Sequence, residues 1–263
     1  MRKLSSVLRA ILVVVLASPL ALAWAPARYL PGRLDTAFEA ALQASFRQLS
    51  ITLAATLALA IALTVALGYA SVLSQRFGRT GASVLNSVES VPAILVALFC
   101  YAPVSGYLAR HASSASQTMS LIVFILAAAA TALPEAVRGV AIPLGDLYHR
   151  KYSLSFRSYG FTKGRILAVL MGSQTMRANL KRVAAGIVLK TLVLDCSFGF
   201  IIQLGFGSYG TPAHPSPGAL IAANRDALFA GGKPILFWLP SLILVVVSLS
   251  FLLTLGERQE AAT

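Results

Sequence analysis

The stretch Leu49–Ala70, LSITLAATLALAIALTVALGYA, decides the fold of this chain. It carries no charged residue, and none occurs anywhere between Arg47 and Arg76. A helix that crosses a bilayer needs roughly 20 mostly apolar residues, because hydrocarbon leaves every backbone polar group to be satisfied inside the segment. The stretch therefore predicts a transmembrane helix and, with it, an all-α membrane fold.

The composition of the whole chain agrees with this prediction. Of the 263 residues, 57% are apolar and 12% are charged, and the mean hydropathy is +0.77. Soluble domains carry about a quarter charged residues, so a soluble globular fold is not expected. The net charge of +13 is expected to mark loops kept in the cytoplasm, where Lys and Arg accumulate in membrane proteins. We therefore expect membrane lipid, and no nucleic acid, as a partner.

Five further apolar runs bring the expected number of spans to six; they lie at about 7–24, 83–104, 118–140, 183–204 and 234–255. The first run ends in Ala21-Leu22-Ala23, which is similar to the small-residue signal of a cleavable leader. We favour a retained anchor, because the other spans need it to balance the topology. The chain then divides into an N-terminal anchor with an external segment, 1–48, and one membrane domain, 49–263.

The distribution of Lys and Arg predicts the sides of the membrane. With six spans both termini share a side, and placing them inside puts fifteen basic residues in cytoplasmic segments and six outside. This asymmetry predicts that both termini are cytoplasmic.

Polar and ionisable residues inside the expected spans are costly in lipid and mark either a path or a contact between helices. Glu89 and Pro92 lie in the third span, and Asp195 and Ser197 in the fifth. These four residues are candidates for lining a translocation path or for packing the helices together. We expect Asp195 to bond a neighbouring helix, whereas the two roles are equally open for Glu89.

The loop between the fourth and fifth spans is about 43 residues long, strongly basic and, by the topology above, cytoplasmic. Within it, Tyr152, Phe156 and Tyr159 recur at spacings of four and three. This spacing predicts one aromatic stripe on a short helix, with Arg157 off that stripe.

A second helix is expected directly after the stripe. Gly160 permits a tight turn and Thr162 is placed to cap the helix. The residues that follow supply an apolar face: Ile166, Leu167, Val169 and Leu170. The loop therefore predicts a helix-turn-helix. On periodicity alone, an equally good interpretation is that this pair rests on anionic headgroups through Arg150, Lys151, Lys163 and Arg165.

Several short motifs follow one another in a recognisable order. Gly160 stands four residues after Leu154-Ser155-Phe156, and Asp195–Phe200 is followed by Leu204-Gly205-Phe206-Gly207 and by Pro215-Ser216-Pro217-Gly218. In order and spacing these segments resemble the permease subunits of ABC importers of the dipeptide, oligopeptide and nickel type. The resemblance covers about Phe38 to Arg258. At Leu154–Phe156 the family has Glu-Ala-Ala, so this loop is a degenerate form of the family's motif.

In that family the loop is a coupling helix that docks into a groove on a cytoplasmic ATPase. The resemblance implies a permease of the bacterial inner membrane that is not itself an enzyme, pairs with a second homologous permease and receives cargo from an extracytoplasmic binding protein. The coupling residues that it implies are Tyr152, Phe156, Arg157, Tyr159, Gly160, Lys163 and Arg165. ATP and Mg²⁺ are expected on the partner ATPase, because the sequence contains no Gly-x-x-x-x-Gly-Lys-Ser/Thr loop to cradle phosphates.

Metal binding has little support in the sequence. His111, His149 and His214 occur on different loops without the spacing of a metal site, and Cys100 and Cys196 each lie within an apolar run. We therefore expect no metal site and no cofactor bound by this chain.

Two alternative functions are open. A secondary carrier driven by an ion gradient through Glu89 and Asp195 would transport without nucleotide. A scaffold or an intramembrane enzyme would use the basic loop only as a surface anchor. The cargo is open as well: peptides, nickel and metal chelates of small amino-acid-derived ligands, or metallophores, rank together.

Overall fold

The structure is a computed structural model that describes residues 17–26, 34–110, 115–201, 216–229 and 232–256. Within these ranges the chain forms helices joined by short turns, without a strand, which confirms the all-α prediction. After a helix at 17–26 come α2 (Thr36–Leu73), α3 (Gln75–Glu89), α4 (Ala93–Arg110), α5 (Ala115–His149), α6 (Lys151–Ser158), α7 (Lys163–Met171), α8 (Gln174–Ile201), α9 (Pro217–Ala223), the 3₁₀ turn η2 (Arg225–Leu228) and α10 (Ile235–Gly256).

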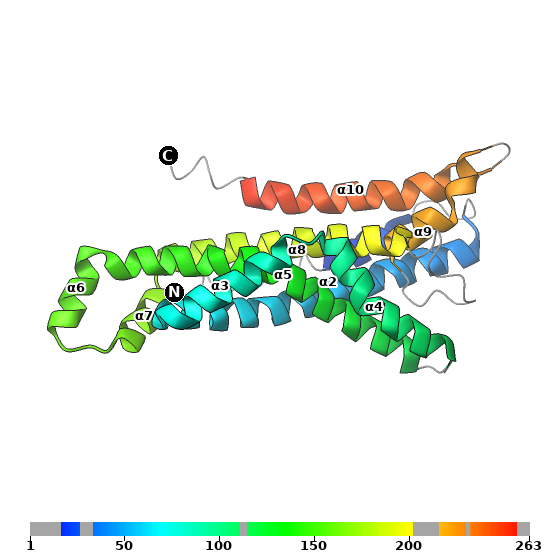
Figure 1. The fold of residues 1–263 in the computed structure, drawn as a ribbon. Helices are drawn as coiled ribbons and strands as arrows, with labels where there is room; N and C mark the ends of the chain where they lie inside the picture. The colour runs from blue at the N-terminus through cyan, green and yellow to red at the C-terminus, as the bar shows by residue number, and fades with distance from the viewer. Residues whose placement is uncertain (1–16, 27–33, 111–114, 202–215, 230–231, 257–263) are drawn as a thin grey trace.

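Three long helices, α2, α5 and α8, form the body of the molecule (Figure 1). The helices α6 and α7 lie at one end of this body and α9 lies at the other, while α10 runs along α8. We refer to these as the α6–α7 end and the α9 end.

Among the described residues, three helices are long and apolar enough to cross a membrane. They contain the expected second and fourth spans and the described part of the expected fifth span, up to Ile201. The expected third span is broken, and the described apolar part of α10 is shorter, at Ile235–Leu249. Much of the expected first span lies outside the described residues. The structure therefore supports three spans, or four if the broken one is included.

The break in the third span is a sharp elbow between α3 and α4. The segments Ser83–Glu89 and Ala93–Tyr101 meet at 91°. Pro92 explains the break, because it lacks an N–H for the helix ladder and disfavours the helical conformation of Val91. One straight span over 83–104 is therefore replaced by two helices that meet at Ser90–Pro92, which we call the elbow.

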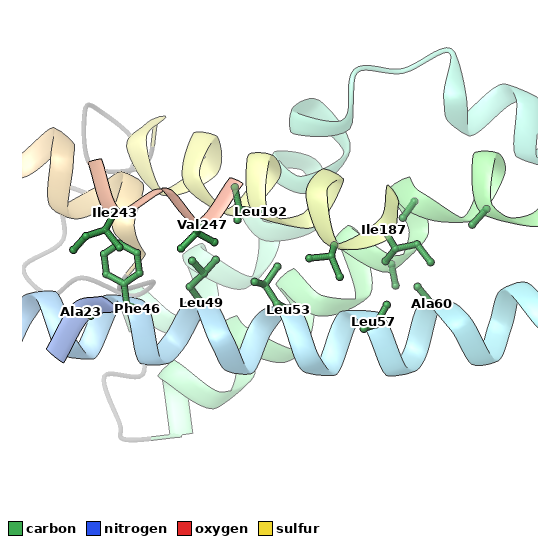
Figure 2. Packing of buried hydrophobic residues seen from close by; sticks show 14 of the residues in the cluster. Ala23, Phe46, Leu49, Leu53, Leu57, Ala60, Ile187, Leu192, Ile243 and Val247 are labelled. Carbon is green, nitrogen blue, oxygen red and sulfur yellow. The ribbon is translucent and has the colours of Figure 1, made fainter. Parts of the chain in front are cut away.

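The main core forms where α2 faces α5, α8 and α10 (Figure 2). Phe46, Leu49, Leu53 and Leu57 recur every three or four residues on α2, which places them on one face of that helix. That face meets apolar residues of α8 and α10, which include Ile187, Leu192, Ile243 and Val247.

The short helix α9 is held against α8 by two glycines. A Cβ at Gly199 would collide with the Oγ of Ser216, and a Cβ at Gly218 would collide with the backbone oxygen of Cys196. Ser216 also caps α9 by accepting a hydrogen bond from the N–H of Ala219 at 3.2 Å. Gly218, which stands in one of the motifs that resemble the family, is therefore required by close backbone approach.

Candidate functional site

The predicted helix-turn-helix is present as the hairpin α6–α7 at the end of α5. Its turn passes through Gly160, which has a φ of 77°, a conformation that residues with a Cβ adopt only at a cost. Thr162 occupies the N-cap position of α7 with extended backbone, but its side chain makes no capping hydrogen bond. The tight turn expected at Gly160 is confirmed, whereas the capping hydrogen bond expected from the Thr162 hydroxyl is wrong.

The aromatic stripe does not face a single environment. Phe156 is half-buried and meets the edge of Phe161 at a ring-centroid distance of 5.8 Å. Tyr159 is 80% exposed, and the side chain of Tyr152 lies outside the described residues. Phe156 therefore stabilises the hairpin, and of the two stripe residues whose side chains are described, Tyr159 is the one that faces solvent.

The outer surface of the hairpin also exposes large apolar side chains. Leu154 and Val169 are both more than half exposed. Together with Tyr159 they define what we call the hairpin tip. Exposed apolar and aromatic side chains on a projecting element are typical of a surface that binds another protein.

Two of the expected basic residues meet at an aromatic ring that the sequence analysis missed. The guanidinium of Arg157 lies 4.1 Å from the ring centroid of Tyr148, and the ammonium of Lys163 lies 5.4 Å from it. Arg157 also donates a hydrogen bond to the backbone oxygen of Tyr148 at 3.2 Å. Tyr148 lies within the basic loop, about eight residues after the expected fourth span, and outside the aromatic stripe from Tyr152 to Tyr159.

The third basic residue, Arg165, stacks within the hairpin. Its guanidinium lies 4.8 Å from the ring centroid of Phe161. The three basic residues therefore contact aromatic rings of this chain: Arg157 and Lys163 at Tyr148, and Arg165 at Phe161. Their charges make the hairpin basic.

The hairpin is fixed to the body by apolar packing and by two hydrogen bonds. Ile166, Leu167 and Leu170 on α7 are buried against α5. The hydroxyl of Tyr69 donates to the backbone oxygen of Gly164 at 2.9 Å, and the ammonium of Lys163 donates to that of Leu73 at 3.0 Å. A force on the hairpin would therefore reach both α2 and α5.

Glu89, a candidate for the path, lies at the elbow and forms an ion pair with Arg138 of α5. The Nε of Arg138 also donates to the backbone oxygen of Pro134 at 3.3 Å. This ion pair joins the elbow to α5. The sequence analysis did not include Arg138, because pairing between distant helices leaves no local pattern.

A second ion pair lies close by on α5. The ammonium of Lys190 on α8 is 3.4 Å from a carboxylate oxygen of Glu135. Glu135 and Arg138 are three residues apart, so they are neighbours on the surface of α5. We call the set Glu89, Arg138, Glu135 and Lys190 the charged belt.

Asp195 and Ser197 are brought near the α9 end. Asp195 is fully buried within α8. Ser197 lines an open groove of about 490 Å³ whose other lining residues are Ile94, Cys196, Phe200, Ile201, Gly218 and Ile221. Ile94 lies two residues after the elbow, and Glu89 of the charged belt lies directly before it. The elbow is therefore the segment of chain between the groove and the charged belt. Pro92 sets the direction of α4, and so the position of Ile94, through the bend that it causes.

No group of three or more His, Cys, Asp or Glu residues that could hold a metal ion occurs in the part of the chain that the structure describes.

Comparison with models of known protein families gives no match, and no curated protein matches the chain.

Proposed function

We propose that this chain is a membrane-spanning permease subunit of an ATP-driven ABC importer, and that the hairpin tip is its coupling surface for a cytoplasmic ATPase. The observation that carries the proposal is the hairpin α6–α7, which exposes Leu154, Tyr159 and Val169 and is anchored to two long apolar helices. The ordered motifs that resemble the family supply the identity of the partner.

The length of α5 favours a protein partner over the membrane surface. Its 35 residues correspond to about 52 Å at 1.5 Å per residue, whereas the hydrocarbon core is about 30 Å thick. An upright α5 therefore carries the hairpin past the headgroups into water. There the exposed Tyr159 and Leu154 gain more from a protein groove than from lipid.

The proposal retains the six spans and the topology expected from the sequence. The basic hairpin end is cytoplasmic, as the positive-inside rule requires, and the α9 end faces the binding protein. A second permease completes the path, which runs past the groove at Ser197 and the elbow at Pro92. ATP and Mg²⁺ bind to the ATPase subunits. Peptides, nickel and metallophores are equally supported as the cargo.

The ion-coupled carrier is less well supported by the observed contacts. That function needs Glu89 to release a proton or bind an ion, whereas Arg138 already engages its carboxylate. The scaffold alternative gives no reason for the apolar hairpin tip to project beyond the bilayer.

Affinity purification from the native host in mild detergent tests the proposal. The wild-type chain is expected to bring down ATPase subunits with measurable ATP hydrolysis, and Tyr159→Ala is expected to lose most of both. Phe229→Ala is the matched control, because Phe229 is an aromatic residue of similar exposure, 71%, far from the hairpin. Recovery of the wild-type chain without any ATPase, or undiminished association of Tyr159→Ala, would contradict the proposal.

A further inference from the structure

Both tryptophans of the chain are exposed at the α9 end. Trp24 lies near the end of the first described helix and Trp238 in the first turn of α10, and their side chains are 57% and 53% exposed. Figure 2 shows Ala23 and Ile243 beside Phe46 at one end of the main core. Trp24 adjoins Ala23, and Trp238 lies five residues before Ile243 in the direction of α9. The two indoles are therefore within about 10 Å of each other along the axis of the body.

Each tryptophan stands where an uncharged run meets a basic residue that is expected outside the membrane. Arg28 follows Trp24 by four residues, and Lys233 precedes Trp238 by five. No charged residue occurs after Trp238 until Glu257, nineteen residues later. This length corresponds to about 28 Å of helix at 1.5 Å per residue, close to the thickness of about 30 Å of a hydrocarbon core. The uncharged run therefore matches one bilayer that begins at Trp238.

The face of α10 that carries Trp238 is apolar over its described part. Ile243 and Val247, on the opposite face, are buried in the main core. A face that binds another protein normally carries a polar rim around its apolar centre. Here the described exposed side chains that follow Trp238 on α10 are all aliphatic: Leu242, Val245, Val246 and Leu249. Lipid hydrocarbon, which is as apolar as these side chains, is therefore the neighbour that this face fits.

We propose that Trp24 and Trp238 anchor the α9 end in a lipid headgroup layer, and that the exposed face of α10 contacts the hydrocarbon beneath that layer. An indole suits the boundary, because its rings favour hydrocarbon and its N–H donates to water or to headgroup oxygens. A second permease must then bind another side of the molecule. This inference requires only that the helices span a membrane, and it holds whether or not an ATPase is the partner.

The anchors also fix the depth of α2 in the bilayer. The helices α2 and α10 run in the same direction, away from the α9 end (Figure 1). Phe46 is level with Ile243 (Figure 2), so Trp238 is level with about residue 41 of α2. A hydrocarbon core about 30 Å thick then ends near residue 61. The last twelve residues of α2 extend about 18 Å beyond it.

The charged belt and the hairpin both lie beyond this limit. A Cβ on Gly68 of α2 would approach Val140 of α5 to 2.8 Å, so these two positions are level with each other. Because α5 runs in the same direction as α2 (Figure 1), Glu135 and Arg138 lie about 3–8 Å past the hydrocarbon, within a headgroup layer of about 5–8 Å. Tyr69, which bonds α7, lies about 12 Å past the hydrocarbon. The belt is therefore at the headgroups, and the hairpin is in water.

Depth-dependent quenching of tryptophan fluorescence tests the anchors. The full chain is reconstituted into phosphatidylcholine vesicles whose acyl chains carry bromine either just below the headgroup or near the bilayer centre. Bromine quenches an indole that it contacts. In the wild type, and in the single-tryptophan variants Trp24→Phe and Trp238→Phe, shallow bromine is expected to quench at least about twofold more than deep bromine.

Val245→Trp and Tyr159→Trp, each in a background that carries Trp24→Phe and Trp238→Phe, are the matched controls. Val245 is on the exposed face of α10, seven residues after Trp238 and so about 10 Å deeper. Deep bromine is therefore expected to quench Val245→Trp more than shallow bromine does. Tyr159→Trp is expected to respond to a quencher dissolved in water and to neither brominated lipid.

Deep quenching that equals or exceeds shallow quenching at position 24 or 238, in protein that elutes as a single folded species, would overturn the anchors. An absence of quenching by either lipid would overturn them as well, because it would show that protein or water covers the indoles. The wild type needs no substitution, so this result does not depend on the folding of a variant. Quenching of Tyr159→Trp by shallow bromine would overturn the depth assigned to the hairpin.

The anchors and the ATPase fail separately. Shallow quenching in a chain that copurifies with no ATPase keeps the anchors and rejects the importer. ATPase association with tryptophans that neither lipid quenches does the reverse.

Discussion

Gly199 and Gly218 set how closely two backbones approach at the α8–α9 contact. At either position a methyl group would meet an atom of the facing element. Overpacking of this kind costs about 1–3 kcal/mol. We therefore expect Gly199→Ala to lower the melting temperature of the purified protein in detergent, measured by loss of the monodisperse peak on heating.

Gly186 provides the control for this prediction within the same helix. A Cβ there meets nothing within 4 Å, so Gly186→Ala removes only the entropic cost of glycine in a helix, about 0.5–1 kcal/mol. It is expected to leave the melting temperature unchanged or slightly raised. Equal losses in the two variants would show that close approach at Gly199 is not the cause.

The turn of the hairpin depends on Gly160, whose φ of 77° costs an ordinary residue about 1–2 kcal/mol. Gly160→Val is expected to loosen the hairpin and speed limited proteolysis between α6 and α7. Gly160→Asn should have a smaller effect, because Asn tolerates this conformation better than a branched residue. Equal proteolysis of both variants and the wild type would contradict the assigned turn.

At the scale of elements, the hairpin is coupled to α2 through Tyr69. Tyr69→Phe removes the hydrogen bond to the Gly164 oxygen, which is worth about 0.5–1.5 kcal/mol. Amide hydrogen exchange in α7 is expected to quicken by a few-fold. Tyr101→Phe is the control, since Tyr101 accepts a hydrogen bond from Ser120 at 3.3 Å on α5, away from the hairpin. Unchanged exchange in Tyr69→Phe would show that the apolar contacts alone hold α7.

The elements that the sequence predicts well are those with a local signal. The uncharged run from Leu49 to Ala70 predicts the central part of α2, and Gly160 with its flanking periodicity predicts the hairpin. The elbow was missed although Pro92 was noted, because a window of mean hydropathy continues through one proline. A proline preceded by a β-branched residue is the signal that would have located the break, and Pro92 is preceded by Val91.

The candidate site was predicted less completely than the helices. Tyr159 is exposed as a docking residue should be, but Phe156 proved to be part of the hairpin's own packing. Arg138 and Lys190 could not be assigned to Glu89 and Glu135 from the sequence. Each pair joins helices far apart in the chain, and such pairing is decided by tertiary packing.

At the scale of the whole molecule, the account predicts opposite sides of the membrane for the two ends. In a background that carries Cys100→Ser and Cys196→Ser, Tyr159→Cys is expected to react with an impermeant thiol reagent only in inside-out vesicles, and Phe229→Cys only in right-side-out vesicles. Both side chains are highly exposed, so access and not burial determines the result. Reaction of both positions from the same side would contradict the topology.

The most direct test of the importer is a photo-crosslinking amino acid at position 159. In living cells of the native host, the account predicts an ultraviolet-dependent adduct. Its partner, identified by mass spectrometry, should contain a Gly-x-x-x-x-Gly-Lys-Ser/Thr loop, and the same amino acid at position 229 should not form that adduct. Adducts at position 159 with lipid alone, or with proteins that lack a nucleotide-binding loop, would contradict the account.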